Sequence, residues 1–255
     1  MNTNQILQVT AFAGKIILEN GGETYRVEET MKRICISLGV KQVDSYVTPT
    51  GIIISISDNN TTNSIVKRIT SRTVNLEKVS MVNDLSRKVS KENLPLKKVK
   101  KELEYIDKYP TYNKNILLIF SGLAAAFFSL LFGGTIKDFF VSFFIGIVIK
   151  LLCTSLYKIK TNEFFVNAIC GIITALLAAG SVQLNLADNI DKTIIGSIML
   201  LVPGISITNA IRDTIAGDIV SGVTRAVESI FIAVAIALGT GFALKLWFNI
   251  FGGLI

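Results

Sequence analysis

The sequence predicts a membrane protein in which an α+β cytoplasmic N-terminal domain is followed by an all-α bundle of five transmembrane helices. Half of the 255 residues are hydrophobic, which is more than an ordinary soluble domain of this length contains. The charges are also uneven. Residues 1–114 hold 18 basic and 12 acidic residues, a net charge of +6, whereas residues 115–255 have a net charge of only +1. We therefore expect a polar domain over residues 1–114 and a membrane-embedded part over residues 115–255.

Five apolar segments in the second part are candidates for membrane spans. Crossing about 30 Å of hydrocarbon takes about 20 helical residues. The segments of suitable length are 115–132, 139–157, 164–184, 193–209 and 219–248. The fourth is interrupted by Pro203-Gly204, and the fifth carries Arg225 and Glu228 near its start.

Basic residues in the short loops predict the orientation of these spans. Lys158 and Lys160 lie between the second and third spans, and Arg212 lies between the fourth and fifth. The loops on the opposite side have no excess of basic residues. Because loops rich in Lys and Arg remain in the cytoplasm, we expect a cytoplasmic N-terminal domain and a C-terminus outside.

The polar domain shows helical periodicity at both ends and strand-like alternation in the middle. The segments predicted as helices are 5–20, 24–38, 76–89 and one that starts near Pro95 and ends before Pro110. Thr24 is placed to cap the second helix, and Gly39 to end it. Residues 42–48 and 52–57 predict a hairpin around Pro49-Thr50-Gly51, with a third short strand near 65–70.

Several classes of function are excluded or disfavoured by what the sequence does not contain. Because it has no histidine, Ser-His-Asp and Cys-His catalysis and His-ligated metals are excluded. Its three cysteines show no CxxC spacing, and no nucleotide-binding or hydrolase motif occurs. We expect no enzyme activity, no cofactor and no metal. The basic run Lys97–Lys101 lacks interleaved aromatic residues, which favours a solvated helix face over a lipid or nucleic-acid patch, and no nucleic-acid partner is expected.

The strongest functional signal is the interrupted fourth span and the polar residues that follow it. A proline inside a span removes a backbone hydrogen bond, and broken helices in transporters present backbone groups to a substrate. Ionisable groups at membrane depth are costly and usually functional. The residues predicted to bind substrate or couple an ion are Pro203, Gly204, Thr208, Asn209, Asp213, Arg225 and Glu228. The alternative is a proline kink before an ordinary charged loop, with Arg225 and Glu228 neutralising one another on one helix face.

A second polar cluster lies at the start of the second predicted helix. Residues 21–28 are denser in polar groups than a helix start requires. One interpretation gives Gly22, Arg26 and Glu28 a docking or gating role facing the membrane part. The other is a surface pair between Arg26 and Glu29, three residues apart.

Three motifs together resemble the threonine/serine exporter family: residues 21–30, residues 48–52 and residues 201–225. The chain is similar in particular to the larger subunit of the two-component members, one of which is associated with succinate export. This resemblance implies a secondary transporter of the bacterial inner membrane that exports small hydrophilic metabolites. The residues to which it points are Gly22, Arg26, Glu28, Pro49, Pro203, Gly204, Asn209, Asp213, Gly217, Gly222 and Arg225.

The resemblance also implies a substrate class and a partner. The substrate would be a threonine- or serine-type amino acid or a dicarboxylate such as succinate. Single-chain members look like this chain followed by a second membrane half, so we expect a separate small integral-membrane subunit or a homo-oligomer in the lipid bilayer. The alternative function is a membrane-anchored sensor or scaffold whose cytoplasmic domain binds a ligand or regulator, although a plain anchor needs no Pro-Gly within a span.

Overall fold

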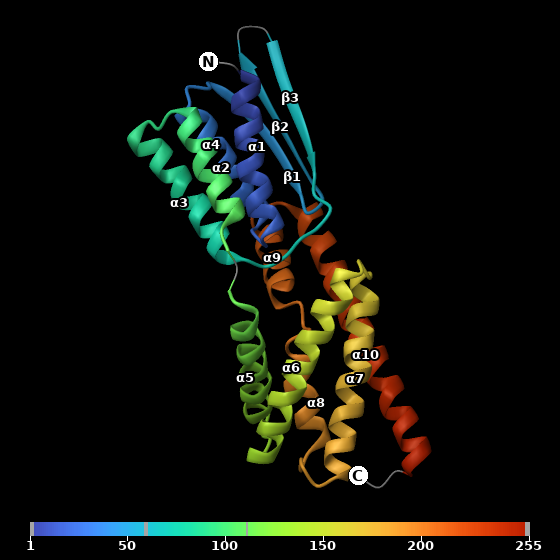
Figure 1. Cartoon of the computed structure of the whole chain (residues 1–255). Coiled ribbons are helices and arrows are strands. Elements are labelled where there is room, and N and C mark those ends of the chain that lie inside the picture. The colour runs from blue at the N-terminus through green and yellow to red at the C-terminus, as the bar shows by residue number, and fades with distance from the viewer. Residues whose placement is uncertain (1–2, 59–60, 111, 253–255) are drawn as a thin grey trace. The chain divides into compact units, whose positions relative to one another are not determined.

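The computed structural model describes residues 3–58, 61–110 and 112–252, which are mostly helical with one small three-stranded sheet (Figure 1). The chain forms two compact units. The first contains Met1–Thr111 and Gly204–Val227, and the second contains Tyr112–Pro203 and Glu228–Ile255. The domain limits predicted from the sequence, 1–114 and 115–255, stay a prediction.

The first unit packs helices against one face of an antiparallel sheet. Its strands lie in the order β1-β2-β3, with Tyr46 opposite Ile53 and Ile53 opposite Val66. Its elements are α1 (Thr3–Glu19), α2 (Thr24–Ser37), β1 (Gln42–Thr48), β2 (Gly51–Asp58), β3 (Thr61–Arg68), α3 (Leu76–Glu92), α4 (Leu96–Lys108), α9 (Gly204–Ile215) and the first turns of α10 (Ile219–Phe251).

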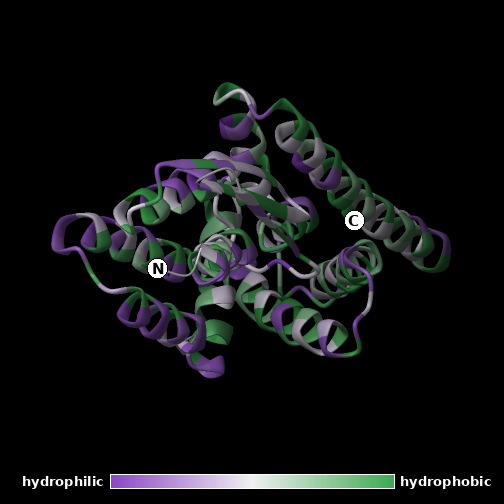
Figure 2. Cartoon of the chain, turned by 90° about the horizontal axis from the view of Figure 1, so that it is seen from above, coloured by the Kyte–Doolittle hydropathy of each residue, from purple (hydrophilic) through white to green (hydrophobic). Residues whose placement is uncertain are grey.

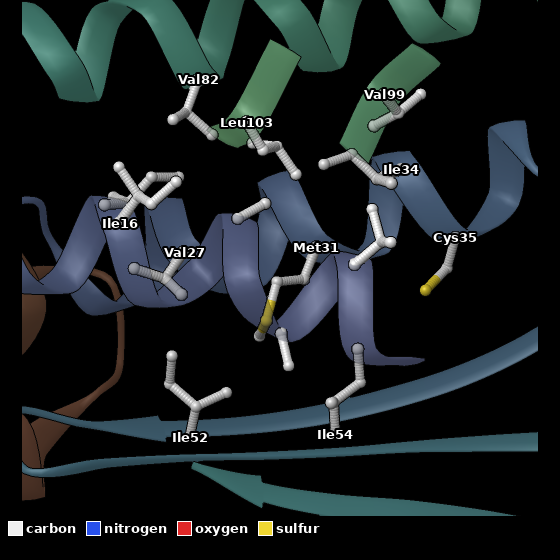
Figure 3. Packing of buried hydrophobic residues seen from close by; sticks show 14 of the residues in the cluster. Ile16, Val27, Met31, Ile34, Cys35, Ile52, Ile54, Val82, Val99 and Leu103 are labelled. Atoms are coloured by element: carbon white, nitrogen blue, oxygen red, sulfur yellow. The ribbon is translucent and has the colours of Figure 1, made fainter. Parts of the chain in front are cut away.

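A continuous hydrophobic core holds this unit together. Met31 on α2 lies between α1 and the sheet, above Ile52 and Ile54 of β2, and Leu103 of α4 closes the far side (Figure 3). All four side chains are fully buried. Each such burial stabilises the fold by roughly 1.5–3 kcal/mol. The alternation of β2, with Ile52, Ile54 and Ile56 inward, fixes which face of the sheet meets the helices.

The predicted helices and hairpin of the first unit are confirmed, with two corrections. The third strand is longer than predicted and begins earlier, at Thr61. Thr24 does not cap α2, because it is the first helical residue, and the capping position belongs to Glu23, which makes no side-chain capping bond. The backbone N–H of Thr24 finds its acceptor much farther along the chain.

Four helices are long and apolar enough to cross a membrane, by length and composition, among the residues that the structure describes. Figure 2 shows long stretches of helix in the green of hydrophobic residues. They are α5 (Lys114–Leu131), α6 (Ile136–Lys158), α7 (Glu163–Gln183) and α10. These correspond to four of the five predicted spans.

The predicted fourth span, residues 193–209, is not a continuous helix. The chain instead forms α8 (Ile190–Ile198), a non-helical stretch through Pro203, and then α9, which belongs to the first unit. Nine residues of α8 extend only about 13 Å, less than half of a bilayer core. Pro203 lacks a backbone N–H and cannot continue a helix from α8. Pro203-Gly204 indicated this interruption in the sequence, but residues 193–209 were still predicted as one span because the segment is apolar and nearly long enough to cross a bilayer.

Small residues bring the helices of the second unit close together. A Cβ on Gly239 of α10 would lie 2.1 Å from the carbonyl oxygen of Ala168 on α7. A Cβ on Gly146 of α6 would lie 2.8 Å from Ala125 Cβ on α5. Close backbone approach of this kind is typical of helix pairs in membranes, where van der Waals contact replaces the hydrophobic effect.

Asp138, which the sequence analysis did not single out, holds the start of α6 to the start of α8. Thr135 and Asp138 form a capping box at α6. The same buried carboxylate accepts hydrogen bonds from the backbone N–H groups of Asp188 and Asn189, at 2.8 and 2.9 Å, just before α8 begins. The Asp138 side chain therefore accepts hydrogen bonds from backbone N–H groups at the starts of two helices.

The contact between α6 and α7 gives a direct test of this packing. The sulfur atoms of Cys153 and Cys170 lie 3.2 Å apart in the second unit. In a Cys35→Ala background, we expect copper–phenanthroline oxidation to join these two thiols within one chain. Cleavage in the 158–162 loop would then leave one disulfide-linked product that dithiothreitol separates. Two separate fragments after full oxidation would contradict the packing of α6 on α7.

Candidate functional site

The two polar clusters predicted from the sequence meet inside the first unit. The start of α2 lies against α9 and the first turns of α10, although some 190 residues separate them in the chain. We call this contact the polar joint. It consists of Gly21, Gly22, Glu23, Thr24, Asn209, Arg212, Asp213, Asp218 and Arg225.

An ion pair between Asp213 and Arg225 lies at the centre of the joint. Arg225 Nε is 3.0 Å from Asp213 Oδ2, and the two side chains are 4% and 0% exposed. The other carboxylate oxygen, Oδ1, accepts a hydrogen bond of 3.0 Å from the backbone N–H of Thr24. Asp213 therefore caps α2 from a distant part of the chain and places negative charge at the positive end of that helix.

The glycine carbonyls before α2 accept hydrogen bonds from side chains of α9 and α10. Asn209 Nδ2 donates to the Gly21 oxygen at 2.8 Å, and an Arg225 terminal nitrogen donates to the Gly22 oxygen at 3.0 Å. A Cβ on Gly22 would lie 2.3 Å from Ile17 Cγ2, and Gly21 has a φ of +90°. These two positions need glycine so that the chain can turn sharply and expose its carbonyls.

Glu23 connects the joint to two arginines. It accepts from Arg212 at 2.6 Å and from Arg26 at 2.7 Å. Burial alone would raise the pKa of Glu23, but hydrogen bonds from its backbone and from these arginines lower it below the usual value. The alternative of a surface pair between Arg26 and Glu29 is not found, because Arg26 pairs with Glu23 and Glu29 pairs with Arg33.

Glu28, the third residue of the predicted docking cluster, forms a hydrogen bond with the backbone of β1. Its carboxylate accepts a hydrogen bond of 2.8 Å from the Val47 N–H, and the Ser221 hydroxyl of α10 donates to the Val47 oxygen at 3.3 Å. Burial raises the pKa of Glu28, and the Val47 hydrogen bond opposes this increase. The edge of the sheet is thereby tied to both α2 and α10.

The turn between α9 and α10 also depends on glycine. Gly217 has a φ of +98°, and a Cβ on Gly222 would come within 2.0 Å of Thr214 Oγ1. The close approach of the two helices places Asp213 and Arg225 opposite one another. Gly217 and Gly222 thus position the two charged side chains by allowing the tight turn and the close approach of the helices.

The structure does not bring every predicted site residue into the joint. Thr208 is exposed, and its hydroxyl donates to the Gly204 oxygen within its own helix, at 2.9 Å. Pro203 and Glu228 belong to the second unit. Gly204 starts α9, and a Cβ there would meet no atom within 4 Å. The joint therefore contains Gly22, Asn209, Asp213 and Arg225 from the prediction, with Arg26 bound to it through Glu23.

Sequence reasoning missed Glu23 and Asp138, and it did not include Arg212 or Asp218 among the candidate site residues. The Thr-x-x-Asp pattern at 135–138 is a capping-box signature that could have identified Asp138. The spacing of Glu23 and Arg26, three residues apart, could have indicated their ion pair, but the other partner of Glu23, Arg212, is distant in the sequence.

The joint holds charge in a form suited to binding a carboxylate or moving a proton. Burial raises the pKa of Asp213 above its ordinary value, while the hydrogen bond from Thr24 and the charge of Arg225 oppose this increase. Its carboxylate thus takes up a proton at a higher pH than an exposed aspartate. No group of three or more Cys, Asp or Glu side chains suited to a metal occurs among the described residues.

The capping role of Asp213 can be tested by hydrogen exchange. We expect Asp213→Ala to speed amide exchange of residues 24–26 at least about tenfold, because a charged cap contributes about 1–2 kcal/mol and Arg225 also loses its partner. Asp213→Asn, which keeps an acceptor, should have a smaller effect. Asp84→Ala, at an exposed position of α3, is the matched control. Equal exchange in all four proteins would show that Asp213 does not hold the start of α2.

Comparison with known proteins identifies the family. No curated protein and no solved structure matches the chain. A family model described as "Putative threonine/serine exporter" matches residues 8–247, which include most of both compact units and the whole joint. This family comprises membrane transporters and not enzymes, which agrees with four apolar helices and confirms the resemblance seen in the motifs. The chain belongs to the threonine/serine exporter family.

Proposed function

We propose that this chain is a subunit of a secondary-active exporter that moves threonine- or serine-type amino acids, or a dicarboxylate such as succinate, out of the bacterial cell across the inner membrane. The observation that carries the proposal is the buried Asp213–Arg225 pair, together with membership of an exporter family. A protein that only anchored a cytoplasmic domain would gain little from burying this pair, since well-packed apolar residues are often at least as stable.

The pair suggests how a carboxylate substrate and a proton could be coupled. Protonation of Asp213 would leave Arg225 buried with less compensation, a situation that costs about 3–5 kcal/mol when one partner of a buried pair is lost. A substrate carboxylate could then take the place of Asp213 beside the guanidinium. The raised pKa of Asp213 brings this protonation closer to physiological pH. Asn209 and the backbone near Pro203-Gly204 would bind the substrate's remaining polar groups.

The other predicted residues have supporting roles in this proposal. Gly22 and Arg26 shape the joint from the cytoplasmic side, and Glu28 ties it to the sheet. Glu228 is the alternative proton carrier, one turn beyond Arg225 on α10. Thr208, exposed on α9, is available to a substrate but not to the joint.

We further propose that the exporter is completed by a separate small integral-membrane subunit, with a homo-oligomer as the alternative. The support is the similarity to the larger subunit of two-component members. The N-terminal domain would face the cytoplasm and the C-terminus the outside, as the basic residues of the loops favour. This topology requires a fifth crossing besides the four apolar helices, which α8 and the stretch through Pro203 would make together.

An efflux assay tests the proposal. Cells preloaded with a threonine- or serine-containing dipeptide would carry the chain alone, the chain with its neighbouring small membrane protein, or an empty vector, and succinate would be followed in the same medium. We expect faster efflux with the pair. Asp213→Asn should reduce efflux to the vector level while the protein remains in the membrane, and Asp84→Asn should leave it unchanged.

Each other result has a defined meaning. Efflux with the chain alone would favour the homo-oligomer. Wild-type efflux by Asp213→Asn would remove Asp213 from the mechanism. No efflux of either substrate class by any combination, with the proteins present in the membrane, would contradict the proposed substrates and favour the sensor.

A further inference from the structure

A cavity in the first unit lies apart from the polar joint and has a chemistry of its own. Its volume is about 650 Å³, within the range of about 300–1,000 Å³ typical of small-molecule sites. Helices α1 and α4 and the edge strand β3 form its walls. No residue of the joint lines it.

The charges around this cavity are mostly of one sign. Five basic side chains and one acidic side chain line it, a net charge of +4: Lys15, Lys67, Arg68, Lys97, Lys100 and Glu104. Lys100 pairs with Glu104 at 3.8 Å, and Lys15 pairs with Glu19 at 3.7 Å. For the other three, no ion pair is found within the described part of the chain. Like charges held around one concavity repel each other and attract an anion.

The start of α4 adds to this positive field. Leu96 and Lys97, the first two residues of the helix, line the cavity. Pro95 occupies the capping position, no side chain caps the helix, and no acidic residue stands in its first turn. Lysine at the positive end of a helix is electrostatically unfavourable, whereas an anion there accepts hydrogen bonds from the free N–H groups. A bound anion would reduce the repulsion between the basic side chains of the cavity and would also neutralise the positive charge at the start of α4.

One wall of the cavity is apolar. Val9 and Phe12 of α1 and Leu96 of α4 line it, and the partly buried Phe12 and Leu96 pack against the hydrophobic core. A small inorganic anion would leave this wall unused. A ligand that joins an aromatic ring to phosphate groups would satisfy both parts, with the ring against Phe12 and the phosphates near Lys67, Arg68 and Lys97.

We propose that this cavity binds a nucleotide-like organophosphate, and that the N-terminal part of the chain is thereby a ligand-binding domain in addition to its proposed role in export. The site does not depend on the proposed export function, because none of its residues belongs to the joint.

Binding of ADP to the full-length chain in detergent micelles, measured by isothermal titration calorimetry, tests the proposal. We expect saturable binding by the wild type and about tenfold weaker binding by Lys67→Glu and by Lys97→Glu, since each loses a charge-assisted contact. Lys32→Glu makes the same charge change at an exposed position of α2 outside the cavity and should bind like the wild type. Phe12→Leu should weaken binding of ADP but not of pyrophosphate.

Several results would overturn the proposal. Absence of saturable ADP binding by the wild type would remove the site. Equal weakening by Lys67→Glu and Lys32→Glu would show only a response to net charge. Adenosine or pyrophosphate binding as tightly as ADP would show that one half of the cavity is not used. Tighter binding of short-chain phosphatidylglycerol than of ADP would assign the cavity to a lipid headgroup.

Discussion

The buried ion pair between Asp213 and Arg225 organises the first unit. Both members also bind the backbone at the start of α2, Asp213 through the Thr24 N–H and Arg225 through the Gly22 oxygen. Removing either charge leaves the other buried with less compensation, which is strongly unfavourable. The helix start, the glycine turn before it and the α9–α10 turn are therefore coupled through one contact. The same contact explains why a domain built from the first hundred residues is completed by residues 204–227.

The Asp213–Arg225 pair both holds helices together and contains a carboxylate with a raised pKa. A fully satisfied, rigid ion pair would only fix α9 and α10 against the domain. Asp213, however, has a pKa raised by burial, and Oδ2 contacts Arg225 without making a hydrogen bond among the described residues. Such a carboxylate can be neutralised more readily than one in a complete hydrogen-bond network. In the proposed function, the joint would have two states that differ by the proton on Asp213, as proton-coupled transport requires.

Most secondary structure could be predicted because the relevant signals are local. The period of α1 and α2, the Pro49-Thr50-Gly51 turn and the long apolar runs each lie within one short segment. The two contacts of Asp213 could not be predicted. Its ion pair with Arg225 depends on the turn at Gly217, and its hydrogen bond with Thr24 joins residues some 190 positions apart. The interrupted fourth span was visible at Pro203, but whether the chain beyond it joins the bilayer part or the polar domain depends on tertiary contacts. Sequence reasoning therefore identified Gly22, Asn209, Asp213 and Arg225 of the joint, but it assigned Asp213 a substrate-coupling role without its capping role.

The central claim is that the joint changes during export, and a reversible crosslink tests it. Thr24 Oγ1 lies 3.3 Å from Asp218 Oδ2, so Thr24→Cys with Asp218→Cys places two thiols across the joint. In a background with Cys35, Cys153 and Cys170 replaced by alanine, export would be measured before oxidation, after oxidation and after reduction. The account predicts loss of export in the oxidised protein and recovery on reduction. Export at the same rate with the crosslink complete would show that the joint is a fixed support and takes no part in transport.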